Sequence, residues 1–270
     1  MRAYSSAIAA SFLTGLGLLA CGDVGGDTSS LPQIRVSCKD TTTEEGEVTA
    51  AGPGLRLSQV TDPKAECANR DVYVTGVVVG AVDQFDETQD GKSRGTIYVQ
   101  DLESKNPYSG VSLFSPTFIP NNLRIAAGDV LDLQGSFVET KTIGATVDFG
   151  DESLPQMSQP IGTFRFDGRS PDPVIIKPED LVDYASGRRW LGMLVKMENV
   201  TLTAKGISNK GRVTATISGE GRDAPTVTNE LFDLPLDSLT QGKQYKSITG
   251  IVTYFFNLHI SPRGPEDLVE

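Results

Sequence analysis

Alternating hydrophobic and polar positions through the middle of the chain predict β-strands separated by turns. The strongest signal is the β-branched run 72–82, where Gly76 and Gly80 allow a long strand to bend without an obstructing side chain. Further alternating segments predict strands at 95–101, 110–114, 128–137 and 145–149. These five strands, with a long connection between the third and the fourth, form one predicted module.

The same order of segments recurs in the second half of the chain. Strands are predicted at 193–202, 213–217, 226–228, 248–254 and 258–260. Val74 then matches Met193, and Gly135 matches Gly250, which suggests an internal duplication. Five prolines between positions 151 and 178 predict a junction between the two modules.

Three segments carry a resemblance to a known fold: Val-Thr-Gly-Val-Val at 74–78, Ile-Tyr-Val-Gln-Asp at 97–101, and Gly-Asp-Val-Leu-Asp-Leu-Gln-Gly at 128–135. With the bent first strand, they resemble the OB-fold, a five-stranded Greek-key barrel. Similar modules occur in secreted bacterial lipoproteins and are appended to some extracellular nucleases. The resemblance covers roughly residues 55–150, and together with the repeated order of segments it implies an all-β chain with two tandem five-stranded OB-like Greek-key barrels. It implies no particular function, because one fold hosts many functions.

The N-terminal segment has the layout of a secretory leader. Arg2 precedes a mostly apolar run, 7–20, which is shorter than the roughly 20 residues that a transmembrane helix needs. The segment Leu-Leu-Ala-Cys at 18–21 resembles the bacterial lipobox, in which the cysteine receives acyl chains such as palmitate. The resemblance implies a lipoprotein anchored through Cys21, and Gly22 after it implies the outer membrane. An ordinary signal peptide with another cleavage site is the alternative.

These patterns predict four parts of the chain. They are a signal peptide at 1–20, a lipidated tether and N-terminal extension at 21–54, a first OB-like domain at 55–165 and a second at 166–270. The tether is poor in apolar residues, which is typical of a flexible spacer. The body of the protein would then face the periplasm or the cell surface.

Charge and cysteine content narrow the partners and the chemistry. A formal net charge of −11 disfavours nucleic acid as a partner, because phosphate binding depends on Lys and Arg. Of the three cysteines, Cys21 is assigned to lipid, which leaves Cys38 and Cys67. In an exported protein such a pair predicts a disulfide, with two separate buried thiols as the alternative.

The sequence contains no recognisable catalytic constellation. His259 is the only histidine, so that serine or cysteine nucleophiles have one candidate base, and it lies between apolar neighbours on a predicted strand. No zinc spacing and no phosphate-binding glycine motif is found. The loop 83–91 holds four acidic residues that calcium could use, but a solvated hairpin loop is the favoured interpretation. We therefore predict no catalytic residue, no metal and no cofactor.

A candidate ligand face lies on the second and third predicted strands. Tyr98 and Phe114 project from these strands and Tyr108 from the loop that connects them. Aromatic side chains at this place in OB-folds stack on bases or sugars. The favoured alternative is that they pack against the second module or the N-terminal extension.

Two functions are favoured over a third, that of a hydrolase, which the single histidine disfavours and which stays open only for chemistry by carboxylates alone. The first is a membrane-anchored, non-enzymatic binding or assembly module, with a protein or an oligosaccharide as its partner. The second is an accessory module that binds nucleic acid or polysaccharide beside a secreted hydrolase. Without a basic rim around the aromatic residues, nucleic acid is the less favoured ligand.

Overall fold

Strands are the main secondary structure of the protein in a computed structural model that describes Cys38 and residues 54–270 except 94, 104, 169, 208–210, 218–223 and 236. The prediction of an all-β chain is thereby confirmed. The described residues all belong to one compact unit. The predicted leader, Cys21 and the tether lie outside the described residues, and so they stay predictions.

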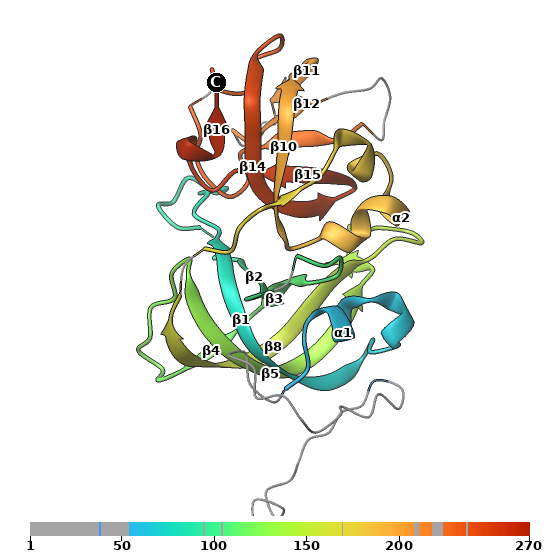
Figure 1. Cartoon of the computed structure of the whole chain (residues 1–270), viewed down its shortest axis with the longest axis vertical. Coiled ribbons are helices and arrows are strands. Elements are labelled where there is room, and N and C mark those ends of the chain that lie inside the picture. Colours follow the sequence, from blue (N-terminus) through green and yellow to red (C-terminus); the bar gives the residue numbers. More distant parts are fainter. Residues whose placement is uncertain are drawn as a thin grey trace, which may run out of the picture. The chain divides into compact units, whose positions relative to one another are not determined.

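The first sheet contains a closed five-stranded barrel. Its strands are β1 (Arg70–Val82), β2 (Ile97–Asp101), β3 (Gly110–Phe114), β5 (Asp129–Thr140) and β8 (Leu154–Asp167). They pair in the order β3-β2-β1-β5-β8, and a parallel pairing of β8 with β3 closes the ring. The short strand β4 (Thr117–Ile119) attaches to β8 outside the ring. In Figure 1, β1, β5 and β8 run side by side through the barrel.

A bend at Gly76 lets β1 contribute to both sides of the barrel. Gly76 has φ 66°, a conformation that side chains disfavour, and its N–H donates to Asp132 Oδ1 at 2.9 Å. The register with β5 shifts between Val74 and Val77, beyond which β1 also pairs with β2. The predicted bend of this strand is confirmed. Apolar side chains from the strands fill the interior, among them Val74, Leu131, Leu133, Phe137 and Met157.

The fifth strand of the barrel differs from the prediction. The segment 145–149 does not join the ring, because β6 (Thr142–Ile143) and β7 (Val147–Asp148) form a separate small hairpin. The ring is closed instead by β8, inside the proline-rich stretch that predicted a junction. Pro160 is tolerated there because it follows Gln159, which has φ 48°, at a register irregularity opposite Gly135.

The second sheet has eight strands and does not close, so that the predicted second barrel is not confirmed. Its strands are β9 (Val174–Ile175), β10 (Leu194–Thr201), β11 (Ala204–Ile207), β12 (Val213–Thr216), β13 (Thr226–Thr228), β14 (Gln244–Phe255), β15 (Asn257–Ser261) and β16 (Leu268–Val269). The main path runs β11-β12-β13-β15-β14-β10-β9, with β16 attached to β14. The described helices are single turns: α1 (Ser58–Thr61), η2 (Pro63–Ala65), η3 (Pro178–Leu181), α2 (Tyr184–Gly187), η4 (Arg188–Trp190) and η5 (Pro265–Asp267).

The two sheets follow a related order of strands. In the second sheet, β11 lies at one end of the ladder and β10 lies next to the other end, beside β9, yet β10 and β11 are successive segments separated only by Leu202 and Thr203. Leu202 N donates to Lys243 O, next to β14, whereas Thr203 N donates to Thr216 O in β12. The interrupted β10–β11 segment therefore pairs with β14 through β10 and with β12 through β11, as the bent β1 pairs with β5 and β2 in the first sheet.

The register refines the positions that correspond between the sheets. Val72 pairs with Gly135, and Val195 pairs with Gly250. If the two glycines correspond, as the sequence suggests, then Val72 corresponds to Val195. Val74, two positions further along the same uninterrupted stretch of β1, would then correspond to Met197 and not to Met193.

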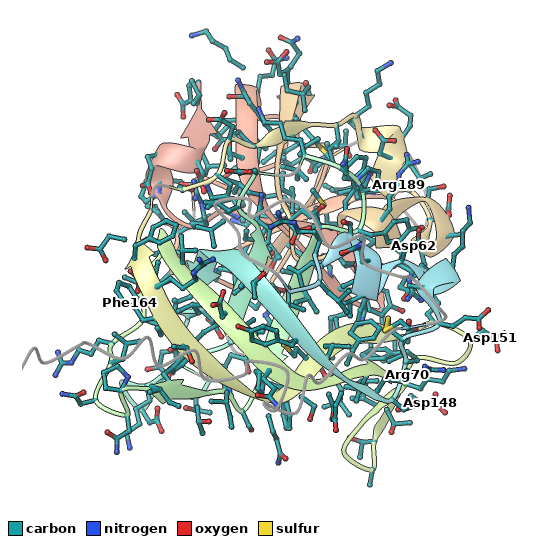
Figure 2. The ribbon with its side chains drawn as sticks, turned by 60° about the horizontal axis from the view of Figure 1, so that its bottom comes forward. Asp62, Arg70, Asp148, Asp151, Phe164 and Arg189 are labelled. Atoms are coloured by element: carbon teal, nitrogen blue, oxygen red, sulfur yellow. A yellow bond between two sulfur atoms is a disulfide. The ribbon has the colours of Figure 1, made fainter. Side chains whose placement is uncertain are left out.

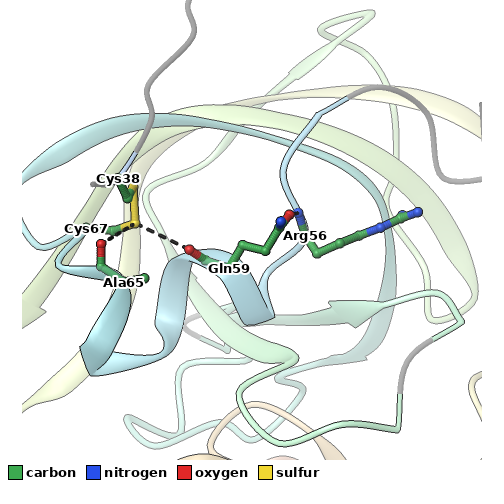
Figure 3. Close-up of a disulfide and its surroundings, with 5 residues drawn as sticks. All are labelled: Cys38, Arg56, Gln59, Ala65 and Cys67. Carbon is green, nitrogen blue, oxygen red and sulfur yellow. Dashed lines mark hydrogen bonds between the residues drawn. A yellow bond between two sulfur atoms is a disulfide. The ribbon is translucent and has the colours of Figure 1, made fainter. Parts of the chain in front are cut away.

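A disulfide joins Cys38 to Cys67 beside the first sheet, as predicted (Figure 3). The Cα atoms are 4.9 Å apart, and Cys67 Sγ lies 3.5 Å from the carbonyl oxygen of Gln59, within α1. The carboxylate of Asp101 accepts hydrogen bonds from Leu57 N at 2.8 Å and Ser58 N at 3.3 Å. The bridge and the carboxylate together attach this N-terminal turn to the barrel.

The junction between the two sheets is tightly packed. Leu194 N donates to Gln100 Oε1 at 2.8 Å, and Gln84 N donates to Leu231 O at 2.9 Å. A Cβ built on Gly110 would lie 2.5 Å from the carbonyl carbon of Gly192, so that the two backbones touch where neither residue has a side chain. The cavity at this junction measures only about 10 Å³.

Candidate binding site at an aromatic hairpin

The turn between β14 and β15 presents two adjacent phenylalanines. Phe255 pairs with Asn257, so that the chain reverses at Phe256. Phe256 has φ 63°, in the left-handed region where tight hairpins normally place Gly or Asn. Phe255 is 41% exposed and Phe256 is 45% exposed. A phenylalanine does not favour this backbone conformation, so its presence in an exposed turn suggests that its ring contacts another molecule.

The first sheet supplies a third ring to this hairpin. Phe149, in the loop between β7 and β8, lies 5.4 Å from the ring of Phe256 and 6.2 Å from that of Phe255, edge-to-face in both cases. Phe149 is buried and belongs to the hydrophobic core of the second sheet. Phe149, Phe255 and Phe256 are here called the aromatic tip.

Two tyrosines support the aromatic tip from beneath. The ring of Tyr254 lies 5.1 Å from that of Phe149, and the ring of Tyr184 lies 5.0 Å from that of Tyr254. Tyr254 Oη donates a hydrogen bond to Glu152, and burial together with this carboxylate raises the pKa of Tyr254. The exposed rings of Phe255 and Phe256 are therefore connected through Phe149 to Tyr254, which packs against Tyr184 and is hydrogen-bonded to Glu152.

A polar network holds this support in place. The guanidinium of Arg188 donates through both terminal nitrogens to the carboxylate of Glu139, which also accepts from Ser153 Oγ at 2.7 Å. Tyr184 Oη donates to Ser153 O at 2.5 Å. Burial opposes ionisation of Glu139, but the hydrogen bonds from Arg188 and Ser153 outweigh it and lower the pKa. Glu139 and Ser153 belong to the first sheet, so that the network crosses the junction.

The arrangement is suited to binding and offers no evident reacting group. The planes of Phe255 and Phe256 meet at 74° with ring centroids 5.0 Å apart. Two rings at this angle cannot both lie flat against one sugar or one base. Together they present two apolar ring faces at an angle, against which a side chain of another molecule can pack.

The predicted ligand face is not assembled as one exposed surface. Tyr98 lies in the junction, where it packs against a cluster that includes Ala81, Leu194 and Ile251. Tyr108 is half-buried, and its N–H donates to Arg189 O at 2.6 Å. Phe114 is 53% exposed. The second sheet thus covers part of this face, and Phe114 remains the exposed member.

His259 lies in the interior of the second sheet, on β15. Its Nδ1 is hydrogen-bonded to Thr226 Oγ1, and its Nε2 lies 3.4 Å from Phe255 O. Burial lowers the pKa of His259, and the nearby Glu230 opposes this only in part. The histidine is therefore neutral near pH 7, and its contacts tie β13 and the end of β14 together.

The acidic loop uses its carboxylates for its own backbone. Asp86 accepts hydrogen bonds from Asp90 N at 3.2 Å and Gly91 N at 2.6 Å, and these bonds lower the pKa of Asp86 against the opposing effect of desolvation. Glu87 pairs with Arg212 of the second sheet. Within the part of the chain that the structure describes, no group of three or more metal-ligating side chains was found.

A shallow groove of about 380 Å³ lies beside β10 and β14, lined in part by Thr201 and Gln244. Its positive charges are already engaged. Lys243 Nζ lies 2.8 Å from the carboxylate of Glu270, and Lys246 Nζ donates to the main-chain oxygen of the same residue at 2.5 Å. The aromatic tip is the stronger candidate, because its two exposed side chains are apolar and lie next to each other.

Sequence reasoning did not identify the aromatic tip. The available signal was the pair Phe255-Phe256 before Asn257, between two predicted strands, where a turn normally carries polar residues or glycine. Phe149 was interpreted as part of a strand of the barrel. Its contact with the second sheet depends on how the two sheets pack, which periodicity does not reveal.

No protein family model and no curated protein sequence matches this chain. Among the described helices, none has the length and apolar character that crossing a bilayer requires.

Proposed function

We propose that this chain is a non-enzymatic binding module of a membrane-anchored lipoprotein, and that its aromatic tip contacts the partner. The observation that carries the proposal is the exposed pair Phe255 and Phe256, held in contact with Phe149 across the two sheets. Exposed aromatic side chains on a rigid support are the usual anchors of binding interfaces. The membrane anchor would be Cys21, and the outer membrane is the proposed location.

Strand order supports an OB-like origin for both halves of the body. In the first sheet, the first three barrel strands are consecutive, β5 pairs beside β1, and the last strand returns parallel to β3. This is the connection expected of a five-stranded Greek-key barrel. The second sheet has a comparable ladder with an interruption between β10 and β11. We propose that it is a second, opened copy of the same module.

Site-specific photocrosslinking in intact cells tests the binding role. A photoreactive amino acid at position 256 of the full chain should form an adduct with a macromolecule, whereas the same group at the exposed Asp233 should not. Mass spectrometry of the adduct distinguishes a protein from a glycan or a nucleic acid. Equal labelling at both positions, or no adduct at 256, would refute the proposed role of the tip.

Membrane fractionation tests the anchor separately. The Cys21→Ser variant of the full chain should leave the membrane fraction, because Sγ of Cys21 is the atom that would carry the lipid. If the variant remains in the membrane fraction, the lipoprotein proposal is wrong, whatever the crosslinks show.

A further inference from the structure

The charges around the aromatic tip are predominantly negative. Asp148 and Asp151 are exposed on either side of Phe149 in the chain, and both lie at the periphery of the molecule in Figure 2. Asp183, next to Tyr184, is also exposed. Two described cations lie nearby. The guanidinium of Arg188 is bound by Glu139, and the exposed Lys141, whose main-chain oxygen accepts a hydrogen bond from Phe149 N, offsets part of the acidic charge. A partner of the tip therefore meets acidic side chains around an apolar centre.

The geometry of the rings favours a particular kind of contact. Because Phe255 and Phe256 are nearly perpendicular, their faces do not form one flat platform for stacked bases or sugars. Each face carries the negative side of an aromatic quadrupole, which attracts a guanidinium or an ammonium group. The methylene stem of the same arginine or lysine can cover the apolar ring edges.

We infer that the aromatic tip binds a basic and apolar segment of a protein partner, in which an arginine or lysine lies against Phe255 and Phe256 and neighbouring cations face Asp148 and Asp151. The inference rests on the proposed binding function and adds the chemistry of the partner. Acidic side chains around the rings repel the phosphates of nucleic acids and the headgroups of anionic lipids. The same side chains raise the rate at which a basic segment associates.

Fluorescence anisotropy on the full-length protein in detergent tests the inference. The probe is a labelled synthetic peptide of alternating Leu and Arg. Peptides in which Glu or Ser replaces Arg are the charge controls, and a labelled oligosaccharide and a single-stranded oligonucleotide represent the other ligand classes. Only the Leu-Arg peptide should bind, and its affinity should fall with added salt.

Variants locate the binding surface. Phe256→Gly removes the ring and fits the left-handed backbone, so that the fold is retained, and it should weaken binding about tenfold. Asp148→Asn and Asp151→Asn should each weaken binding about threefold. Phe114→Ala is the matched control, because it removes an exposed phenylalanine outside the aromatic tip and should leave the affinity unchanged.

Each outcome decides the inference. Tight binding of the Glu or Ser peptide, preference for the oligosaccharide or oligonucleotide, or equal loss in Phe114→Ala overturns it. Absence of binding by the Leu-Arg peptide also overturns it. If crosslinks at position 256 persist in that case, the proposed function stands and only the basic character of the partner is wrong. If both experiments fail, the binding function falls as well.

Discussion

Asp83 is buried where the β1–β2 loop meets the second sheet, and its replacement by asparagine tests the electrostatics of the junction. The side chain is 8% exposed, and its Oδ1 accepts a hydrogen bond from Phe85 N at 2.9 Å. Burial raises the pKa of Asp83 to about 6. The hydrogen bond from Phe85 opposes this rise, the carboxylates of Glu230 and Glu87 add to it, and Arg212 partly offsets them.

The sign of the effect on stability follows from proton binding. A carboxyl group with a pKa of about 6 in the folded chain and about 3.9 in the unfolded chain holds more protons when folded between these values. The free energy of unfolding therefore decreases as pH rises from about 4 through 6. The pKa difference corresponds to about 3 kcal/mol. Water at the edge of the loop screens the charge, and so we expect about 1.5 kcal/mol.

Urea denaturation at several pH values measures this effect. Asp83→Asn keeps an oxygen acceptor for Phe85 N and removes the charge. The free energy of unfolding of the variant should therefore exceed that of the parent by about 1.5 kcal/mol near pH 8. Near pH 4 the difference should shrink to within about 0.5 kcal/mol. Asp233→Asn, at an exposed position, should follow the parent throughout. A loss of stability near pH 8, or a gain that does not depend on pH, would refute the reasoning.

Three further predictions concern the packing between the sheets. Gly110→Ala places a Cβ 2.5 Å from the backbone of the second sheet, and urea denaturation should show a loss of about 2 kcal/mol. Glu139→Gln leaves Arg188 without its carboxylate, and the free energy of unfolding should fall by about 2 kcal/mol near pH 7. Because the pKa of Glu139 is lowered in the folded chain, this difference from the parent should fade as pH drops below about 4. A double-mutant cycle between Phe149→Ala and Phe256→Gly should give a coupling of about 1 kcal/mol, and zero coupling would contradict their ring contact.

The positions of strands could be predicted where β-branched or alternating apolar residues mark them. The segment 72–82 shows this clearly, because β-branched residues with a glycine bend are what a strand shared by two sides of a barrel requires. The segment 154–167 lacks that signal. Its prolines indicated a junction, although two of them, Pro155 and Pro160, lie within a barrel strand. Pro160 lies at a register irregularity, where the backbone N–H that proline lacks would not have been paired with β5.

The candidate site was less accessible to sequence reasoning than the strands. Tyr98 has the alternation expected of an outward side chain on β2, and it does point away from the barrel interior. Whether that side meets solvent or another sheet depends on packing between segments about 100 residues apart, such as the contact of Gln100 with Leu194. Local patterns carry no information about such contacts. The close approach of the two backbones at Gly110 and Gly192 can be recognised only in the structure, because the sequence does not show that these glycines lie side by side.

The packing of the two sheets against each other explains why the exposed aromatic residues lie where they do. The second sheet partly covers Tyr98, so that this side of the barrel is not open as a whole to a large ligand. The same packing brings the loop that contains Phe149 against the β14–β15 turn, and it supplies the support that holds Phe255 and Phe256 in place. Neither sheet alone contains the three rings. A binding surface at the aromatic tip is therefore a property of the joined pair, and the selective pressure on such a surface would act on the residues of the junction as much as on the rings.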